Sequence, residues 1–329
     1  MTDRTNIDET DAKILRTLLK EARTSFTEIA KDCKISVGAV RKRYSRLRRT
    51  GIISGKIMQV NPRSLGYKCI ANVGIMTAKE DESKVIEFLE RKPYSRMVFR
   101  NLFEKTNIAV IVSLQSFEEL PETLREIEAN PAVKHAGAFT WSKTSNLDYP
   151  ENLVLEPSIG KTERESHIVA NTVNLEKAKV DKTDRQIAKI LSQDSRTPFT
   201  KIAEELNVST KKVIERYSRL KGSVLTSSTI TVDLRKLGYN AMALLLMKVA
   251  HKVRTPEILT EMLQISNLIT VMELFGEEDV LQLIIVLRDY EELFRLKRQL
   301  NMIQGIERLE LILSEPYQAW PLNLFASLL

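Results

Sequence analysis

The sequence contains two copies of one pattern, 173 residues apart. Residues 35–47 read ISVGAVRKRYSRL, and residues 208–220 read VSTKKVIERYSRL. The correspondence begins near residues 7 and 180 and continues to residues 67 and 239. A repeat of this length indicates that a whole structural unit has been duplicated. The chain has 329 residues, enough for both copies to bury a core, so we expect two copies of one fold in a single polypeptide.

Each copy of the pattern predicts a short helix with two different faces. Ser36 is a favourable N-cap residue, and Val40, Tyr44 and Leu47 follow at helical spacing on one apolar face. Residues 41–49 add six basic side chains and no acidic one. A helix with an apolar base and a cationic outer side fits the DNA major groove. We therefore predict a DNA-recognition helix.

The residues around this helix complete a winged helix-turn-helix module. Asp8 can cap a first helix whose apolar stripe includes Ile14 and Leu18, and a second short helix passes through residues 26–30. Residues 51–60 consist of two β-prone pieces around a turn, which is typical of a wing.

The segment after each module predicts a second domain. Strands and helices are expected between residues 67 and 147 in the order β-α-β-β-α-β, which is ferredoxin-like, and residues 241–313 repeat it. The expected fold class is α+β, with two winged helix-turn-helix modules (1–66 and 180–239), each followed by a βαββαβ ferredoxin-like domain (67–149 and 240–329), a linker at 150–179 and an apolar C-terminal tail in the last domain.

Basic charge is concentrated in the two helix-turn-helix modules. Residues 1–66 hold 15 Lys and Arg against 7 Asp and Glu, and residues 180–239 hold 12 against 7, whereas the whole chain carries +7. The balances of +8 and +5 leave −6 for the remainder. This distribution favours two modules that bind a polyanion and two domains that do not.

The composition argues against several other classes of protein. Cys33 and Cys69 are too few for a disulfide framework, and with three histidines they predict no metal site and no cofactor. No apolar run approaches the roughly 20 residues of a membrane span, and no signal peptide begins the sequence. We expect a soluble, cytoplasmic protein with no membrane partner.

The candidate DNA-binding residues lie at the start and on the outer side of the two helices. They are Ser36, Val37, Gly38, Arg41, Lys42, Arg46 and Arg49 in the first copy, and Ser209, Thr210, Lys211, Lys212, Glu215 and Arg219 in the second. We expect Arg43 and Arg216 to form structural ion pairs, and Tyr44 and Tyr217 to belong to the core.

The two helices differ in their outward chemistry, because Glu215 replaces Lys42 and Lys211 replaces Gly38. A carboxylate repels phosphate and suits only a cytosine amino group. Our hypothesis is that the first module supplies more affinity and that the second has drifted in specificity or role. Charge reversal at Lys42 should then cost more DNA affinity than alanine at Lys211.

Several short motifs carry a resemblance to a known family: Asp8-x-x-Asp11-x-x-Ile14-Leu15, Ala22-Arg23, Glu28-Ile29-Ala30, Ile35-Ser36, Arg43, Leu47, Gly51 to Gly55, and Leu65-Gly66. With them the chain resembles the leucine-responsive regulatory protein (Lrp/AsnC) family, twice. The resemblance implies a transcriptional regulator whose helix-turn-helix binds double-stranded DNA and whose βαββαβ domain dimerises and binds an amino-acid effector. Pairing of the β-domains within one chain and pairing between chains, as a homo-oligomer, both stay open.

The resemblance also implies an effector site. In the family, a Gly-x-x-Asp turn between the middle strands lines the effector cleft, and Gly276 and Asp279 match it here. Residues 102–106 of the first copy lack both. A tight acidic hairpin turn is the alternative interpretation of residues 276–279.

Two other functions are compatible with the sequence. A group of sirohaem decarboxylases resembles the same fold, but those enzymes use His and Arg on strands facing the cofactor. This chain has no His in either central hairpin, although Arg96 and Arg100 lie in the first. The chain is therefore expected not to be an enzyme, and to show no spectral change with added tetrapyrrole. A degenerate regulator acting through protein contacts is the other alternative.

Two modules in one chain predict a mode of binding. If the β-domains pair, both recognition helices can enter successive major grooves, roughly 34–36 Å apart. Since the helices differ in outward residues, we expect an imperfect palindrome. An effector bound between the β-domains would change DNA affinity through linkage.

Overall fold

The fold consists of two copies of one α+β unit, as predicted from the sequence. The computed structural model describes residues 7–103, 106–141, 178–250, 258, 261–262, 265, 267–276 and 280–329. The helices are α1 (Glu9–Lys20), α2 (Phe26–Cys33), α3 (Val37–Arg49), α4 (Glu82–Glu90), α5 (Glu119–Glu128), α6 (Lys182–Gln193), α7 (Phe199–Glu205), α8 (Thr210–Leu220) and α10 (Tyr290–Met302). The strands are β1 (Ile53–Val60), β2 (Cys69–Thr77), β3 (Ser95–Phe103), β4 (Thr106–Leu114), β5 (Val133–Trp141), β6 (Leu225–Val232), β7 (Ala241–Val249), β8 (Leu268–Phe275), β9 (Val280–Leu287) and β10 (Ile306–Ser314).

Side-chain caps fix the starts of the helices in both helix-turn-helix modules. The Asp8 carboxylate accepts a hydrogen bond from the Asp11 amide, and the Asp11 side chain accepts one from the Asp8 amide, which forms a capping box. Asp181 and Asp184 form the same box at α6. The hydroxyl groups of Ser36 and Ser209 cap the two recognition helices. These caps define where each helix begins.

The expected wing hairpin is wrong. Residues 53–60 form one strand, β1, which pairs antiparallel with β6 of the other repeat in a two-stranded ribbon. Gly55 suggested a turn, but it is needed for close packing, because a Cβ there would lie 2.7 Å from the Thr231 Oγ1. The residues that were expected to form a hairpin within each module therefore pair with each other and join the two repeats.

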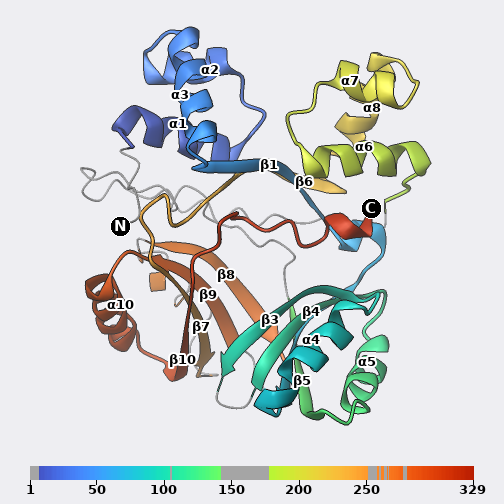
Figure 1. Cartoon of the computed structure of the whole chain (residues 1–329), viewed down its shortest axis with the longest axis vertical. Helices are drawn as coiled ribbons and strands as arrows, with labels where there is room; N and C mark the ends of the chain where they lie inside the picture. The colour runs from blue at the N-terminus through green and yellow to red at the C-terminus, as the bar shows by residue number, and fades with distance from the viewer. Residues whose placement is uncertain are drawn as a thin grey trace.

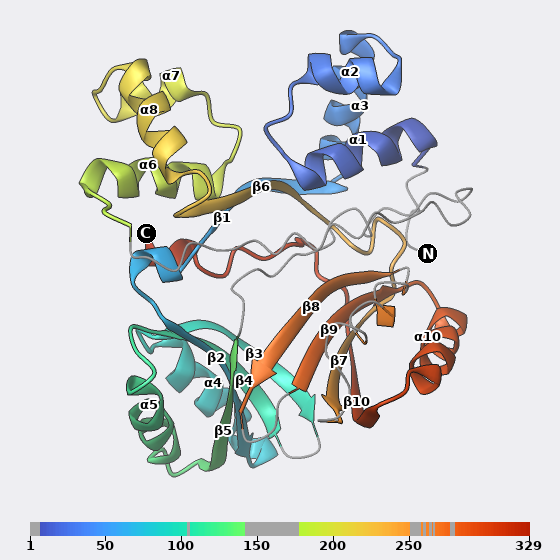
Figure 2. The same ribbon diagram turned by 180° about the vertical axis from the view of Figure 1, so that it is seen from behind.

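The crossing of β1 and β6 places each helix-turn-helix module over the other repeat's β-domain (Figure 1; Figure 2). The first module shares a core with Ile230, Val232 and Met242 of the second repeat. The second module shares a core with residues of the first repeat that include Met58 and Ile70. Neither repeat therefore buries its recognition module without the other.

The two β-domains join edge to edge within the chain. Their eight strands have the order β10-β7-β9-β8-β5-β2-β4-β3, and Thr140 and Trp141 of β5 pair with Phe275 and Leu274 of β8. Each half keeps the strand order of a ferredoxin-like sheet. The helices α4, α5 and α10 lie on the outer sides of this sheet. The faces of its two halves that these helices do not cover are turned toward each other (Figure 1).

The apolar tail after β10 is buried between the helical layer and the sheets (Figure 1). Trp320 pairs with Val232 through two backbone hydrogen bonds and lies in the core of the first module. Phe325 lies in the core of the second module, and the Asn323 amide donates to the carbonyls of Met58 and Ser192. The tail thus contacts both cores.

Some predictions fall on other residues. The linker, apart from residues 178 and 179, and Asp279 lie outside the described residues. Within the described part of the chain, no helix is both long and apolar enough to cross a membrane.

Candidate nucleic-acid interface

Both recognition helices belong to modules that project from the same side of the molecule, above the β1–β6 ribbon (Figure 1; Figure 2). In α3, Val40 and Leu47 are buried. In α8, the corresponding Val213 and Leu220 are buried. These apolar residues hold each helix against its module and leave the other side of the helix in solvent.

Most of the predicted DNA-binding residues are exposed. In the first module these are Ser36, Gly38, Arg41, Lys42 and Arg49, and in the second they are Ser209, Lys211, Lys212, Glu215 and Arg219. Val37, Arg46 and Thr210 are half-buried. None of the exposed cations Arg41, Lys42, Lys211 and Lys212 forms an ion pair with another described residue, so each is available to an anionic partner.

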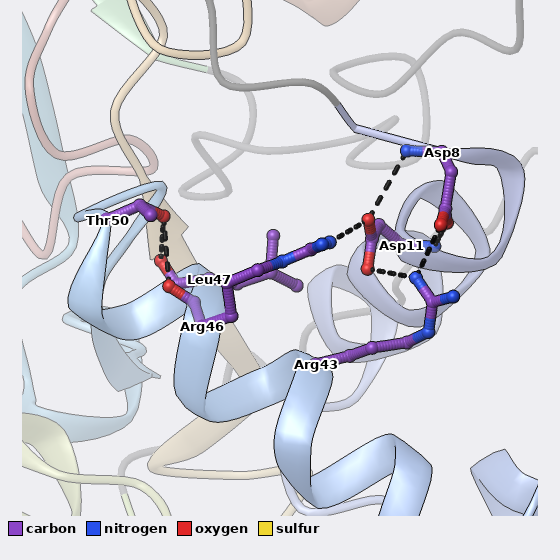
Figure 3. Close-up of polar contacts among 6 residues, drawn as sticks. All are labelled: Asp8, Asp11, Arg43, Arg46, Leu47 and Thr50. Carbon is purple, nitrogen blue, oxygen red and sulfur yellow. Dashed lines mark hydrogen bonds and ion pairs between the residues drawn. The ribbon is translucent and has the colours of Figure 1, made fainter.

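A buried carboxylate at the base of each recognition helix binds two arginines (Figure 3). Asp11 is fully buried, and it pairs with Arg43 at 2.9 Å and with Arg46. Arg43 also pairs with Asp8 at 2.6 Å. The two arginines balance the charges of Asp8 and Asp11, so the buried Asp11 is not left as an unpaired charge. The predicted structural ion pair of Arg43 is confirmed.

The second module repeats this network. The buried Asp184 pairs with Arg216 at 2.8 Å and with Arg219 at 2.5 Å, and Asp181 pairs with Arg216 at 2.6 Å. The hydrogen bond from Arg216 lowers the pKa of Asp181 to about 2, so this carboxylate stays charged at neutral pH.

Arg46 and Arg219 consequently differ from the other predicted DNA-binding cations. Their side chains are 39% and 59% exposed, but each guanidinium group is bound to a buried aspartate. Their charge is therefore largely neutralised within the module. The positions in the sequence gave no sign of this, because the partner lies 35 residues away on another helix.

Four residues at helical spacing form the outermost line of each recognition helix, here called the outer stripe. It consists of Gly38, Arg41, Lys42 and Ser45 in α3 and of Lys211, Ile214, Glu215 and Ser218 in α8. All eight are exposed, and Ile214 is 45% exposed. Ile214 was not among the predicted DNA-binding residues, although it occupies the position in the second copy that Arg41 occupies in the first.

Two arginines hold the modules to each other in a reciprocal arrangement, here called the arginine clasp. Arg23 donates to the carbonyls of Ser195 and Thr197, and Arg196 donates to those of Ala22 and Thr24. Each guanidinium group also lies over an aromatic ring of the opposite module: Arg23 over Phe199 at 4.3 Å and Arg196 over Phe26 at 4.7 Å.

The clasp reaches the recognition helices through aromatic contacts. The ring centroids of Phe26 and Tyr44 are 5.1 Å apart, and those of Phe199 and Tyr217 are 4.9 Å apart. Tyr44 belongs to α3 and Tyr217 to α8, and both rings pack in the module cores as predicted. Each recognition helix therefore rests on a ring that is covered by the other module's arginine.

The ends of the recognition helices are also held by the opposite repeat. The Lys236 ammonium donates to the Thr50 carbonyl at 2.6 Å, where its charge complements the C-terminus of α3. The Ser223 carbonyl, at the corresponding end of α8, accepts hydrogen bonds from Ser64 and Asn61. The aromatic core contact and the C-terminal end of each helix are thus fixed relative to the other half.

The predicted effector residue Gly276 lies at the seam between the β-domains. A Cβ at this position would be 2.8 Å from the Phe139 ring and 3.0 Å from the Ala138 carbonyl. Gly276 therefore permits the close approach of β5, whereas Asp279 lies outside the described residues.

Other candidates from the sequence have structural partners. Arg100 pairs with Glu82 of α4, and His135 lies on the surface with its Nδ1 3.3 Å from a carboxylate oxygen of Glu128 in α5. Arg96 donates to the Ser327 hydroxyl of the tail. Cys69 is buried, which raises its pKa to about 11 and leaves the thiol unreactive.

Comparison with known proteins agrees with this architecture. Residues 7–54 match a family model described as winged helix-turn-helix DNA-binding, and residues 180–221 match the AsnC-type helix-turn-helix domain. Over 105 residues the chain is 42% identical to the HTH-type transcriptional regulator LrpA of Pyrococcus horikoshii, covering 32% of this chain and 74% of that protein. The chain belongs to the Lrp/AsnC family. The HTH-type transcriptional regulator Ptr1 of Methanocaldococcus jannaschii is 37% identical over 124 residues, covering 36% of this Lrp/AsnC chain and 80% of its own.

The solved structures add a similarity over nearly the whole chain. The siroheme decarboxylase NirDL superposes with a TM-score of 0.62 at 17% identity, covering 93% of this Lrp/AsnC protein and 91% of that chain. At this identity the similarity concerns the fold alone. It includes both repeats, in agreement with a tandem Lrp/AsnC arrangement.

Proposed function

We propose that this protein is a sequence-specific transcriptional regulator that binds double-stranded DNA with both helix-turn-helix modules of one chain. The observation that carries the proposal is the pair of exposed recognition helices on one side of the molecule, held by a shared ribbon and clasp. The two helix-turn-helix modules, here called the heads, form a rigid pair that suits two half-sites on the same face of a duplex.

The electrostatics support the same proposal. Arg41 and Lys42 extend from the first recognition helix without an ion-pair partner among the described residues, and Lys211 and Lys212 do so at the start of the second. Cations on both modules would contact phosphates and supply a salt-dependent part of the affinity. We expect the protein to act in the cytoplasm, on DNA.

The proposal includes control by a small effector, of which an amino acid is the class expected. Gly276 at the seam between β5 and β8 is the described part of the candidate site. A ligand that changed the packing of this seam would alter the placement of the two β-domains, and with it the relative position of the heads.

The test is DNA binding by matched pairs of alanine variants. Duplexes selected from a random pool by the wild-type protein serve as the probe. Replacing Arg41 and Lys42 by alanine should lower affinity by about tenfold or more and reduce the slope of log K against log salt by roughly two, because two cations that displace counterions from the DNA are lost. Replacing Lys211 and Lys212 by alanine should have a smaller effect.

The control removes the same charge elsewhere. Alanine at the exposed Lys297 and Arg298 of α10, on the opposite side of the molecule, should leave affinity within about twofold of wild type, because screened charges at that distance contribute little. Equal losses from all three pairs, or no selection from the random pool, would contradict the proposal.

An enzymatic function is the second candidate, because the fold similarity to a siroheme decarboxylase spans nearly the whole chain. Against it, Arg100 and His135 are directed to helices on the outer faces of the sheet. We propose that the protein is not an enzyme. A shift in the absorption spectrum when a tetrapyrrole is added to the purified protein would favour the enzyme instead.

A further inference from the structure

The two outer stripes present opposite chemistry to the groove. We propose that α8 reads a half-site through a thymine methyl group and a cytosine amino group, whereas α3 reads its half-site through guanine. The inference rests on the proposed function and concerns its specificity: Ile214 and Glu215 are the residues that distinguish the second half-site from the first.

Geometry places these residues where bases would be read. Positions i, i+3, i+4 and i+7 lie along one side of a helix, and the four stripe residues of α8 occupy them opposite the buried Val213 and Leu220. Ile214 is 45% exposed there, an apolar side chain on the most outward line of a helix whose flanks are basic. Its exposed part faces solvent on this line, where it can contact a partner.

Glu215 adds a carboxylate to this surface. Lys211, four residues earlier on the same stripe, forms no ion pair with Glu215, and the guanidinium group of Arg219, four residues later, is bound to Asp184 at 2.5 Å. Glu215 forms no ion pair with any other described residue. The ion-pair network at the base of α8 thereby leaves an uncompensated carboxylate on the outer stripe.

The major groove offers partners for these two groups. Thymine presents a methyl group and cytosine an amino group that only an acceptor can bind, and a carboxylate is repelled by phosphates and by the acceptors of guanine. On α3 the same two positions hold Arg41 and Lys42, which prefer the O6 and N7 of guanine. Each stripe therefore rejects what the other accepts.

The difference between the two stripes determines the symmetry of the DNA site, here called the operator. A perfect palindrome presents the same base edges to both heads, so one of the two stripes would always meet the wrong edge. The arginine clasp holds both heads in place, and neither can avoid the contact. The operator must have two different half-sites.

The experiment compares sites selected from a random pool by the full-length wild type and by a converted variant. Wild type should select paired half-sites of different sequence. The variant carrying Ile214→Arg and Glu215→Lys has the central residues of the α3 stripe on both heads. It should select a second half-site resembling the first and bind a palindrome of two first half-sites at least about tenfold more tightly than wild type does.

Two controls keep the result interpretable. Unchanged preference at the first half-site establishes that the converted variant is folded and binding. Glu291→Lys on α10 makes the same charge change as Glu215→Lys far from the heads, and should leave both half-sites as in wild type.

Selection of two identical half-sites by wild type would overturn the inference while leaving DNA binding intact. So would a second half-site without base preference, or a second half-site that the converted variant leaves unchanged. Failure of wild type to select any sequence would remove the proposed function together with the inference.

Discussion

At the scale of single residues, the arginines of the recognition helices divide into two groups. Arg41 projects on the outer stripe, whereas Arg43 and Arg46 are three residues apart on the side that faces α1, where Asp11 binds both (Figure 3). Helical spacing predicted the structural role of Arg43. It could not predict that of Arg46, because the depth of Asp11 depends on how α1 crosses α3.

A substitution at Asp11 tests this division. Asp11→Asn keeps the shape of the side chain but leaves two arginines facing a neutral group, so the free energy of unfolding should fall by about 2 kcal/mol. Urea denaturation followed by circular dichroism measures it. Asp32→Asn, at an exposed position in α2, is the matched control and should change stability by less than about 0.5 kcal/mol. Similar losses from both variants would mean that the network does not stabilise the module.

At the scale of elements, the helices and strands and their order along the chain could be predicted from the sequence, because each element depends on the local periodicity of apolar residues. The partner of β1 was not. Its antiparallel partner β6 lies about 170 residues later, and Gly55, which resembles a turn residue, in fact accommodates Thr231. The arginine clasp was equally hidden, since each contact joins residues 172 to 174 positions apart.

The clasp predicts a spacing preference. Replacing both Arg23 and Arg196 by lysine keeps their charge but removes the planar group that bridges two carbonyls and stacks on a ring. The wild type should discriminate strongly against an operator lengthened by two base pairs between its half-sites, and the double variant should lose most of that discrimination. The measurement is the ratio of the two affinities.

Arg235→Lys supplies the comparison for the clasp variant, because Arg235 binds Glu315 and the Pro316 carbonyl and takes no part in the clasp. It should keep the wild-type ratio. A double clasp variant that binds more weakly but with an unchanged ratio would assign these arginines to stability alone.

At the scale of the whole molecule, the internal repeat predicted two units, and the distribution of charge favoured the two helix-turn-helix modules as the ones that bind a polyanion. The exchange of modules between repeats was beyond the sequence. Either module has the same apolar pattern, and both β-domains offer a similar surface, so only the geometry of the β1–β6 crossing decides which pairs form.

Cutting the chain should therefore not separate its halves. With a protease site inserted after Gly160, cleavage yields two fragments, each containing one repeat. They should co-elute in size-exclusion chromatography at the position of the intact protein, because both cores contain residues from both fragments. Uncut protein carrying the insertion serves as the reference. Two separate peaks after cleavage would show that the shared cores are too weak to hold the repeats together.

The tail that ends in the second core also has a meaning for biosynthesis. Trp320 and Phe325 follow every helix-turn-helix and sheet element in the chain, and they insert into two different cores. A ribosome therefore delivers these two residues after the helix-turn-helix and sheet elements described above, so the nascent chain passes through a state in which each core still lacks one large aromatic side chain. A premature stop codon before residue 315 would leave it in that state permanently.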